Sequence, residues 1–157
     1  MPSRRDLIRM TDDEVRGFLR EKKSITIVSN GRDGYPHPMP MWFTADPDGT
    51  VRMTTFRKSQ KVVNVKRDPR VTLMVEDGVE YPELRGVVIE GTCELVDDLE
   101  AVKQTLIDIT TREAPPDAAG RAAMGNVIAG TAAKRVLLRI RPRSVVSWDH
   151  RKLGGRY

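Results

Sequence analysis

Hydroxyl and cationic side chains gather in one short segment, Arg52-Met-Thr-Thr-Phe-Arg-Lys-Ser-Gln-Lys-Val-Val-Asn64. A strand bearing two threonines is predicted to end in this segment, and Ser59 is placed as the N-cap of a helix. Free backbone N–H groups at a helix N-terminus, with hydroxyls and cations nearby, bind a phosphate monoester. The segment therefore predicts a phosphate site, and a capped helix with solvated lysines is the alternative interpretation. The side chains concerned are Thr54, Thr55, Arg57, Lys58 and Lys61.

A second candidate is the strand predicted over Tyr35–Ala45, in which proline recurs at every second residue from Pro36 to Pro40. Proline has no N–H to donate to a neighbouring strand, so this strand must have an open edge. A planar heterocycle could lie along such an edge, against backbone carbonyl and amide groups. Met41 and Trp42 also have a simpler interpretation as core side chains, which is the more common place for apolar strand residues.

The elements that must position these segments follow from apolar periodicity. Thr11-Asp-Asp-Glu14 has the form of a capping box and begins a helix over 11–22. Further helices are expected from Ser59 to before Pro69, from Leu99 for about fourteen residues, and weakly over 118–133. Strands are expected over 25–28, 35–45, 51–56, 71–76, 86–96 and 135–147.

Six antiparallel strands joined largely by hairpins predict a mainly β fold, a closed or nearly closed barrel with peripheral helices. Neither a Gly-x-Gly-x-x-Gly run nor a P-loop motif occurs, so dinucleotide-binding and P-loop folds have no support.

Composition narrows the class of protein further. At 157 residues the chain is expected to form a single domain, 1–157. No apolar stretch approaches the length of a membrane span and no export signal is recognised, so a soluble cytoplasmic protein without membrane partners is expected. One cysteine, Cys93, and two histidines disfavour a disulfide or a metal site. The net charge of +5 is concentrated in residues 50–75 and 134–157, which favours a local anionic ligand.

Several of these residues resemble a known group of proteins. Lys58-Ser-Gln-Lys61, Asn64 and Arg67-Asp-Pro-Arg-Val71, with the order of elements around them, resemble the pyridoxamine 5′-phosphate oxidase-like split β-barrel superfamily. The chain is similar in particular to the actinobacterial branch of deazaflavin (coenzyme F420)-dependent reductases, from about Thr11 to Gly154. The resemblance implies a six-stranded antiparallel split β-barrel like that of FMN-binding proteins, with an N-terminal helix (11–22), a helical insertion (98–133) and a C-terminal tail (148–157).

The resemblance also implies a homodimer with two cofactor clefts between subunits. In such families the strand matching Met39–Phe43 passes its backbone along the tricyclic ring. The ribityl and phosphate end is held by the positions matching Thr54, Thr55, Ser59, Gln60 and Lys61. The cofactor-binding residues carried over or considered are Met39, Pro40, Met41, Trp42, Thr54, Thr55, Lys58, Ser59, Gln60, Lys61, Tyr81, Trp148, Arg151 and Lys152.

The chain departs from true pyridoxamine phosphate oxidases at two places. Phe43 and Thr44 stand where those enzymes carry a basic residue, and the chain ends Leu153-Gly-Gly-Arg-Tyr157 instead of in an Arg-Leu-x-Pro-like sequence. Oxidation of pyridoxamine phosphate is therefore disfavoured. The segment Trp148–Lys152 could instead reach over the partner's site, with the indole stacking and the cations meeting an acidic group. The alternative is a tail that packs on its own barrel.

The expected activity is that of an oxidoreductase that uses F420 to transfer hydride to an unidentified small molecule. No catalytic residue is assigned; Tyr81 and His150 are candidates for a proton donor. An FMN-dependent reductase or oxidase of the same fold is the first alternative, and a non-catalytic flavin-binding protein is another. A basic nucleic-acid-binding barrel is disfavoured, because three Phe, three Tyr and two Trp are too few for base stacking.

Overall fold

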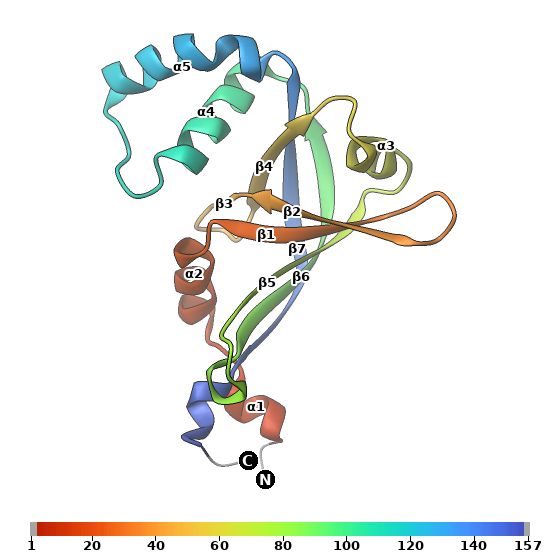
Figure 1. Ribbon diagram of the computed structural model, residues 1–157, viewed down its shortest axis with the longest axis vertical. Helices are drawn as coiled ribbons and strands as arrows, with labels where there is room; N and C mark the ends of the chain where they lie inside the picture. The colour runs from red at the N-terminus through yellow and green to blue at the C-terminus, as the bar shows by residue number, and fades with distance from the viewer. Residues whose placement is uncertain (1–2, 156–157) are drawn as a thin grey trace.

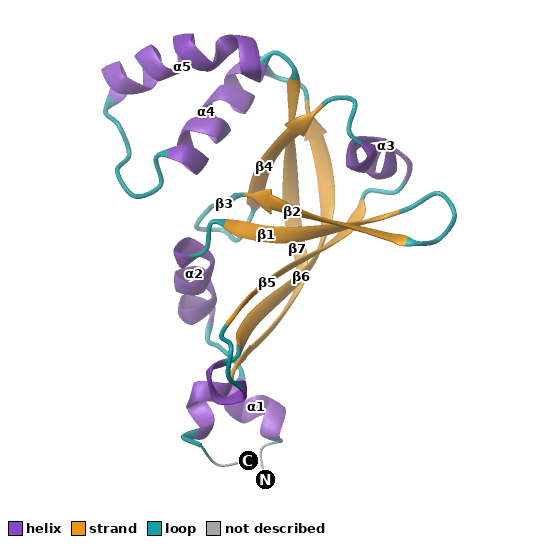
Figure 2. Cartoon of the chain, viewed as in Figure 1, coloured by secondary structure: helices purple, strands orange, loops and turns teal. Residues whose placement is uncertain are grey.

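The computed structural model describes residues 3–155, and its centre is a strongly curved antiparallel sheet in the order β2-β1-β5-β6-β7-β4-β3 (Figure 1). Its strands are β1 Ser24–Asn30, β2 Pro36–Trp42, β3 Thr44–Ala45, β4 Val51–Phe56, β5 Arg70–Asp77, β6 Arg85–Val96 and β7 Arg135–Asp149. The helices are α1 Arg4–Ile8, α2 Asp12–Glu21, α3 Gln60–Arg67, α4 Leu99–Thr110 and α5 Ala118–Ala132, with 3₁₀ turns η1 Tyr81–Glu83 and η2 His150–Leu153. They surround the sheet at its ends and sides (Figure 2).

The expectation of a mainly β split barrel is confirmed, with one more strand than predicted. The segment expected as one strand over Tyr35–Ala45 divides at Phe43, because β2 pairs with β1 whereas β3 pairs with β4. The short helix α1 was not predicted. Strand β7 continues through Trp148 to Asp149, so the predicted tail over 148–157 begins inside this strand; residues 156 and 157 lie outside the described part.

The core lies inside the curved sheet. Alternate residues of each strand point inward, as the pleat of a strand requires, and their side chains are almost completely buried. The inward set includes Ile25, Ile27, Phe43, Met53, Leu73, Val87, Ile89, Cys93, Leu138 and Ile140. Helix α2 closes one end, and Phe18 and Leu19 on its apolar face join this core.

The predicted capping box of α2 is present. The Thr11 hydroxyl accepts from the backbone N–H of Glu14 at 3.2 Å, and the Glu14 carboxylate accepts from the N–H of Thr11 at 2.6 Å. Two of the donors that a helix N-terminus leaves free are thereby satisfied.

The helical insertion forms an α4–α5 hairpin on the outer side of the barrel (Figure 1). Val102 of α4 and Ala132 of α5 bury Leu137, the side chain of β7 that points away from the barrel core. Among the described residues, no helix is both long enough and apolar enough to span a membrane.

Candidate functional site

The barrel is split between its two edge regions. Strand β4 pairs with β7 over six residues but with β3 only at Val51 and Arg52, so within residues 3–155 Met53–Phe56 has no ladder partner on its other side. Strand β2, with its three prolines, is the opposite end strand of the sheet, as its missing N–H groups require. Strands β2 and β4 also contact each other. Both predicted site segments therefore border the same opening.

Helix α3 begins at the free end of β4 and brings three polar side chains together. The Lys61 ammonium donates a hydrogen bond to Thr55 Oγ1 at 3.1 Å, and the Thr55 hydroxyl donates to Ser59 Oγ at 3.2 Å. Ser59 occupies the predicted N-cap position, but its side chain caps no backbone N–H of the helix. The backbone N–H groups of Gln60 and Lys61 accordingly have no acceptor in residues 3–155.

The remaining polar side chains of α3 fix the helix to the barrel. Gln60 Nε2 donates to Asn64 Oδ1 at 3.0 Å, and Asn64 Nδ2 donates to Ser29 Oγ of β1 at 3.1 Å. Asn64 and Ser29 are buried. Buried amides are held by their hydrogen bonds, so the hydrogen bonds from Gln60 through Asn64 to Ser29 set the position of the α3 N-terminus against β1.

Lys61 is the least expected feature of the site. Its side chain is buried, with 7% of the residue exposed, and it forms no ion pair with any residue in 3–155. Burial lowers the pKa of Lys61 below its ordinary value, because an ammonium group loses hydration that one hydroxyl does not replace. A buried cation bonded to the first of two linked hydroxyls, at a helix start with two unused N–H groups, fits a phosphate group, so the residues present match the end of a phosphorylated cofactor.

Thr54 lies on the opposite face of β4 from this cluster. Arg135, the partner of Phe56 across the β4–β7 ladder, places its guanidinium 3.4 Å from Thr54 Oγ1 and over the Phe56 ring at 4.4 Å. Its Nε has no hydrogen-bond partner among the described residues although it is buried. Arg135 was not among the predicted site residues; it lies in the basic window 134–157, but only the strand register places it beside Thr54.

The two other cations of the turn, Arg57 and Lys58, differ in whether they already have partners within the protein. Arg57 already has partners within the protein, since it forms an ion pair with Asp97 and donates to the carbonyl oxygen of Ala133. Lys58 is exposed and forms no ion pair within residues 3–155.

The four selected residues of β2 point in alternate directions. Met41 packs against the barrel core, whereas Pro40 is exposed. Met39 is 38% exposed and Trp42 is 65% exposed. An exposed fraction of 65% is high for an indole, a side chain that is largely buried on average. The structure thus supports the core interpretation for Met41 and an exposed position for Trp42.

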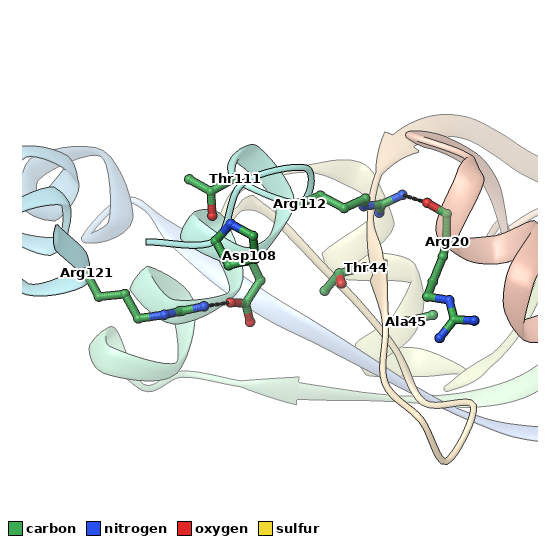
Figure 3. A pocket seen from close by; sticks show the side chains of 8 residues that line it. Arg20, Thr44, Ala45, Asp108, Thr111, Arg112 and Arg121 are labelled. Atoms are coloured by element: carbon green, nitrogen blue, oxygen red, sulfur yellow. Dashed lines mark hydrogen bonds and ion pairs between the residues drawn. The ribbon is translucent and has the colours of Figure 1, made fainter. Parts of the chain in front are cut away.

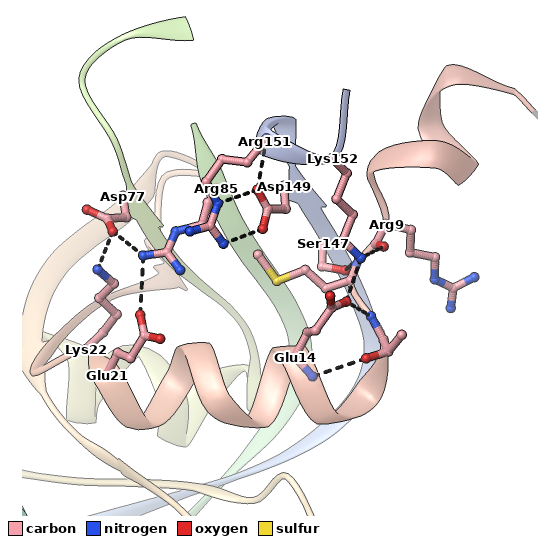
Figure 4. Close-up of polar contacts among 12 residues, drawn as sticks. Arg9, Glu14, Glu21, Lys22, Asp77, Arg85, Ser147, Asp149, Arg151 and Lys152 are labelled. Atoms are coloured by element: carbon pink, nitrogen blue, oxygen red, sulfur yellow. Dashed lines mark hydrogen bonds and ion pairs between the residues drawn. The ribbon is translucent and has the colours of Figure 1, made fainter. Parts of the chain in front are cut away.

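Tyr81, Trp148, Arg151 and Lys152 lie at the other end of the molecule, near α1 and the C-terminus (Figure 1). The Arg151 side chain makes two hydrogen bonds to the Asp149 carboxylate, at 2.9 and 2.6 Å, and Lys152 binds Glu14 Oε2 at 2.6 Å and the Arg9 carbonyl at 2.8 Å (Figure 4). Within one chain these residues do not join the Lys61 cluster, so any role at a cofactor requires a second copy.

Comparisons with known proteins find one matching family model and several similar solved structures. A family model described as pyridoxamine 5′-phosphate oxidase matches residues 11–149. A solved structure of a conserved hypothetical protein from Mycobacterium tuberculosis is 37% identical, with a TM-score of 0.86 over 99% of this chain and 95% of that one. No curated protein matches.

Two more distant structures share the fold. One described as an F420 reductase is 24% identical, with a TM-score of 0.61 over 82% of this chain and 93% of that one. An FAD-binding protein from Mycobacterium smegmatis is 18% identical, with a TM-score of 0.58 over 88% and 95% of the two chains.

Proposed function

Because this chain belongs to the pyridoxamine 5′-phosphate oxidase family, we propose that it is an oxidoreductase that uses coenzyme F420, a phosphorylated deazaflavin, to transfer hydride to a small molecule. The bound deazaflavin would supply the hydride chemistry. The protein would supply binding, orientation and exclusion of water.

Burial of Lys61 without a carboxylate is the observation that carries this proposal. An ammonium group removed from water costs folding free energy unless an anion compensates it. Here the ammonium is bonded to the Thr55 hydroxyl, which donates in turn to Ser59 at the open N-terminus of α3, so a cofactor phosphate there would restore the missing interaction. Lys58 would add charge from the surface of the same turn.

The edge of β2 supports a ring beside this phosphate site. From Pro36 to Pro40 the prolines leave carbonyl oxygens and no N–H groups on the unpaired side, so this part of the edge offers acceptors only. Deazaflavins and flavins both carry a ring N–H that can donate to such an edge. The backbone of Met39–Trp42 would lie along the ring, with the exposed side chains of Met39 and Trp42 beside it.

We further propose that the protein works as a homodimer. Residues paired directly across the sheet point to one face, and on the outer face they form a row of mostly apolar side chains from Pro40 through Thr26, Met74 and Val88 to Val146. Met74 and Val146 are each 40% exposed. A second copy covering this row would bury it, and Met74→Asp should shift the protein to monomers in sedimentation experiments if the proposal is correct.

A second copy is also what would bring Tyr81, Trp148, Arg151 and Lys152 to a cofactor. Their role in the cleft stays a prediction, because Arg151 and Lys152 are paired within their own chain. An FMN-dependent enzyme or a flavin-binding protein without turnover is the alternative function, since the phosphate contacts would be the same for either cofactor.

The decisive experiment is a calorimetric titration of the purified protein with F420 and with FMN. Lys61→Met keeps the volume of the side chain and removes its charge, so cofactor affinity should fall about tenfold to a hundredfold. Lys66→Met is the matched control, because Lys66 is an exposed lysine of the same helix, and affinity should not change.

Tighter binding of FMN than of F420 would favour the alternative cofactor. Equal affinity of the wild type and Lys61→Met would contradict the assigned site. Oxidation of the reduced cofactor by added electron acceptors then separates an enzyme from a binding protein.

A further inference from the structure

Two adjoining cavities lie between the barrel and the α4–α5 insertion, apart from the Lys61 cluster. The smaller, of about 230 Å³, lies between α2, β3 and the two insertion helices, and Figure 3 shows its lining side chains. The larger, of about 440 Å³, borders the end of β2 and the connection after α4. Thr111 and Arg112 line both cavities, so the two form a continuous surface.

The smaller cavity has a positive lining. Three arginines, Arg20, Arg112 and Arg121, face it together with one carboxylate, Asp108. Asp108 is already bound on both oxygens, by Arg121 at 2.6 Å and by Arg52 at 3.1 Å. The carboxylate therefore leaves two of the three lining arginines without an anionic partner.

Arg112 is held in place without being neutralised. Its guanidinium donates to the backbone carbonyls of Arg20, Lys22 and Phe43 and lies over the Phe43 ring at 5.0 Å. Carbonyl oxygens orient a guanidinium but carry no net charge. Partial burial lowers the pKa of Arg112, which reflects the same lack of an anion.

Arg20 completes the charge on the other side of the cavity. It is exposed, forms no ion pair within residues 3–155, and approaches from α2 while Arg121 approaches from α5 (Figure 3). The Thr44 side chain lies between them and adds a hydroxyl. Guanidinium groups converging on a small cavity are the usual receptor for a carboxylate or phosphate group.

The larger cavity suits an apolar group instead. Trp42 forms one wall with its indole, and Ile109 and Ala114 add apolar surface. The charged pair at its rim, Lys23 and Glu113, is already joined at 2.7 Å. Glu113 would repel an anion here, so a bound anion is directed towards the arginines and a ring towards Trp42.

We propose that the two cavities form one binding site for a small aromatic acid, with its acid group among Arg20, Arg112 and Arg121 and its ring against Trp42. Trp42 and Thr44 lie on the same face of the segment that continues from β2 into β3, so the ring would sit next to the proposed cofactor edge. The assignment of this acid as the substrate rests on the proposed function; the binding site itself does not.

The test is calorimetric titration of the cofactor-free protein with benzoate, phenyl phosphate and neutral benzamide. The two anions should bind and benzamide should not, and the tighter anion identifies the preferred acid group. Arg20→Gln should weaken binding of the anions about tenfold, the usual effect of losing one charge-assisted contact. Arg16→Gln is the matched control, one turn earlier on α2, and should leave binding unchanged.

Trp42→Leu tests the ring half of the site. It should weaken benzoate binding but not the binding of inorganic phosphate, which has no ring. If benzamide binds as well as benzoate, or if Arg20→Gln behaves like Arg16→Gln, the site is not an anion site.

The proposed function and this site can fail independently. Lys61→Met should weaken binding of the cofactor but leave binding of benzoate unchanged. Cofactor binding without benzoate binding would overturn only the acid site, and benzoate binding without cofactor binding would overturn only the proposed function.

Discussion

The indole of Trp148 lies directly over Gly86, its partner across the β6–β7 ladder. A Cβ atom on residue 86 would come within 2.7 Å of Trp148 Cε2 and closer still to two other ring atoms. The bare backbone of Gly86 therefore serves as the surface on which the indole packs.

Gly86→Ala should destabilise the protein by about 1 to 3 kcal/mol, because a bulky ring must leave its place. Denaturant unfolding of Gly86→Ala, Trp148→Ala and the double variant measures this. If the clash is the cause, the second substitution costs less in the Gly86→Ala background than alone. Additive losses would contradict the packing of Trp148 on Gly86.

Asp149 predicts a loss of stability in acid. The Arg151 side chain, which donates two hydrogen bonds, lowers the pKa of Asp149, and the backbone N–H of Arg151 contributes. A carboxyl whose folded-state pKa is lowered stabilises the fold above its unfolded value of about 3.9, and this contribution is lost as pH falls towards the folded-state pKa.

The wild type should therefore exceed Asp149→Asn in unfolding free energy by about 1 kcal/mol at pH 6, since Arg151 is partly exposed. The difference should shrink as the pH falls below about 4. Urea unfolding of both proteins from pH 6 down to pH 3 checks this, and a constant difference would show that the ion pair contributes nothing.

Burial of Lys61 also predicts stability that rises with pH, but in the alkaline range. Burial lowers the pKa of its ammonium, so between the folded-state pKa and the unfolded value of about 10.4 the unfolded chain binds more protons. Stability of the wild type should rise relative to Lys61→Met as pH increases through this interval. Below it, Lys61→Met without cofactor should be more stable by on the order of 1 kcal/mol, because it buries no charge.

Thermal or denaturant unfolding of the cofactor-free proteins from pH 7 to pH 10 measures this difference, and Lys66→Met again serves as the control. A Lys61→Met protein that is less stable than the wild type at neutral pH would show that the ammonium is satisfied without a ligand.

The sequence was informative wherever a local pattern has one physical meaning. Prolines at alternate positions of β2 required an open edge, and Thr11 with Glu14 required a helix start; both are present. The hydroxyls and lysine of the turn before α3 were also found from type and spacing. Their burial was not, because spacing alone does not distinguish a buried Lys61 from a solvated one.

What the sequence missed depends on contacts between distant residues. Arg135 reaches Thr54 only through the register of β4 and β7, and Lys152 reaches Glu14 across 138 positions. Helix α1 has five residues, too few to be stable alone, and it packs against β7 and η2. The arginines of the acid site come from α2, α5 and the loop after α4, so no local motif unites them.

The hydrogen bonds of Arg112 hold the α4–α5 insertion against the barrel. Its side chain joins the loop after α4 to backbone carbonyls at the end of α2 and beside β2. Arg112→Met should free this loop, and since the contact of Arg112 with the barrel core is at Phe43, strands β5 and β6 should largely keep their stability. Amide hydrogen exchange in residues 110–117 should therefore become about tenfold faster or more, with little change in β5 and β6.

Arg121→Met is the comparison, since Arg121 joins α5 to α4 at Asp108 and should instead affect α5. Equal exchange of the loop in the wild type and Arg112→Met would mean that the α4–α5 hairpin is held by Val102, Ala132 and Leu137 alone.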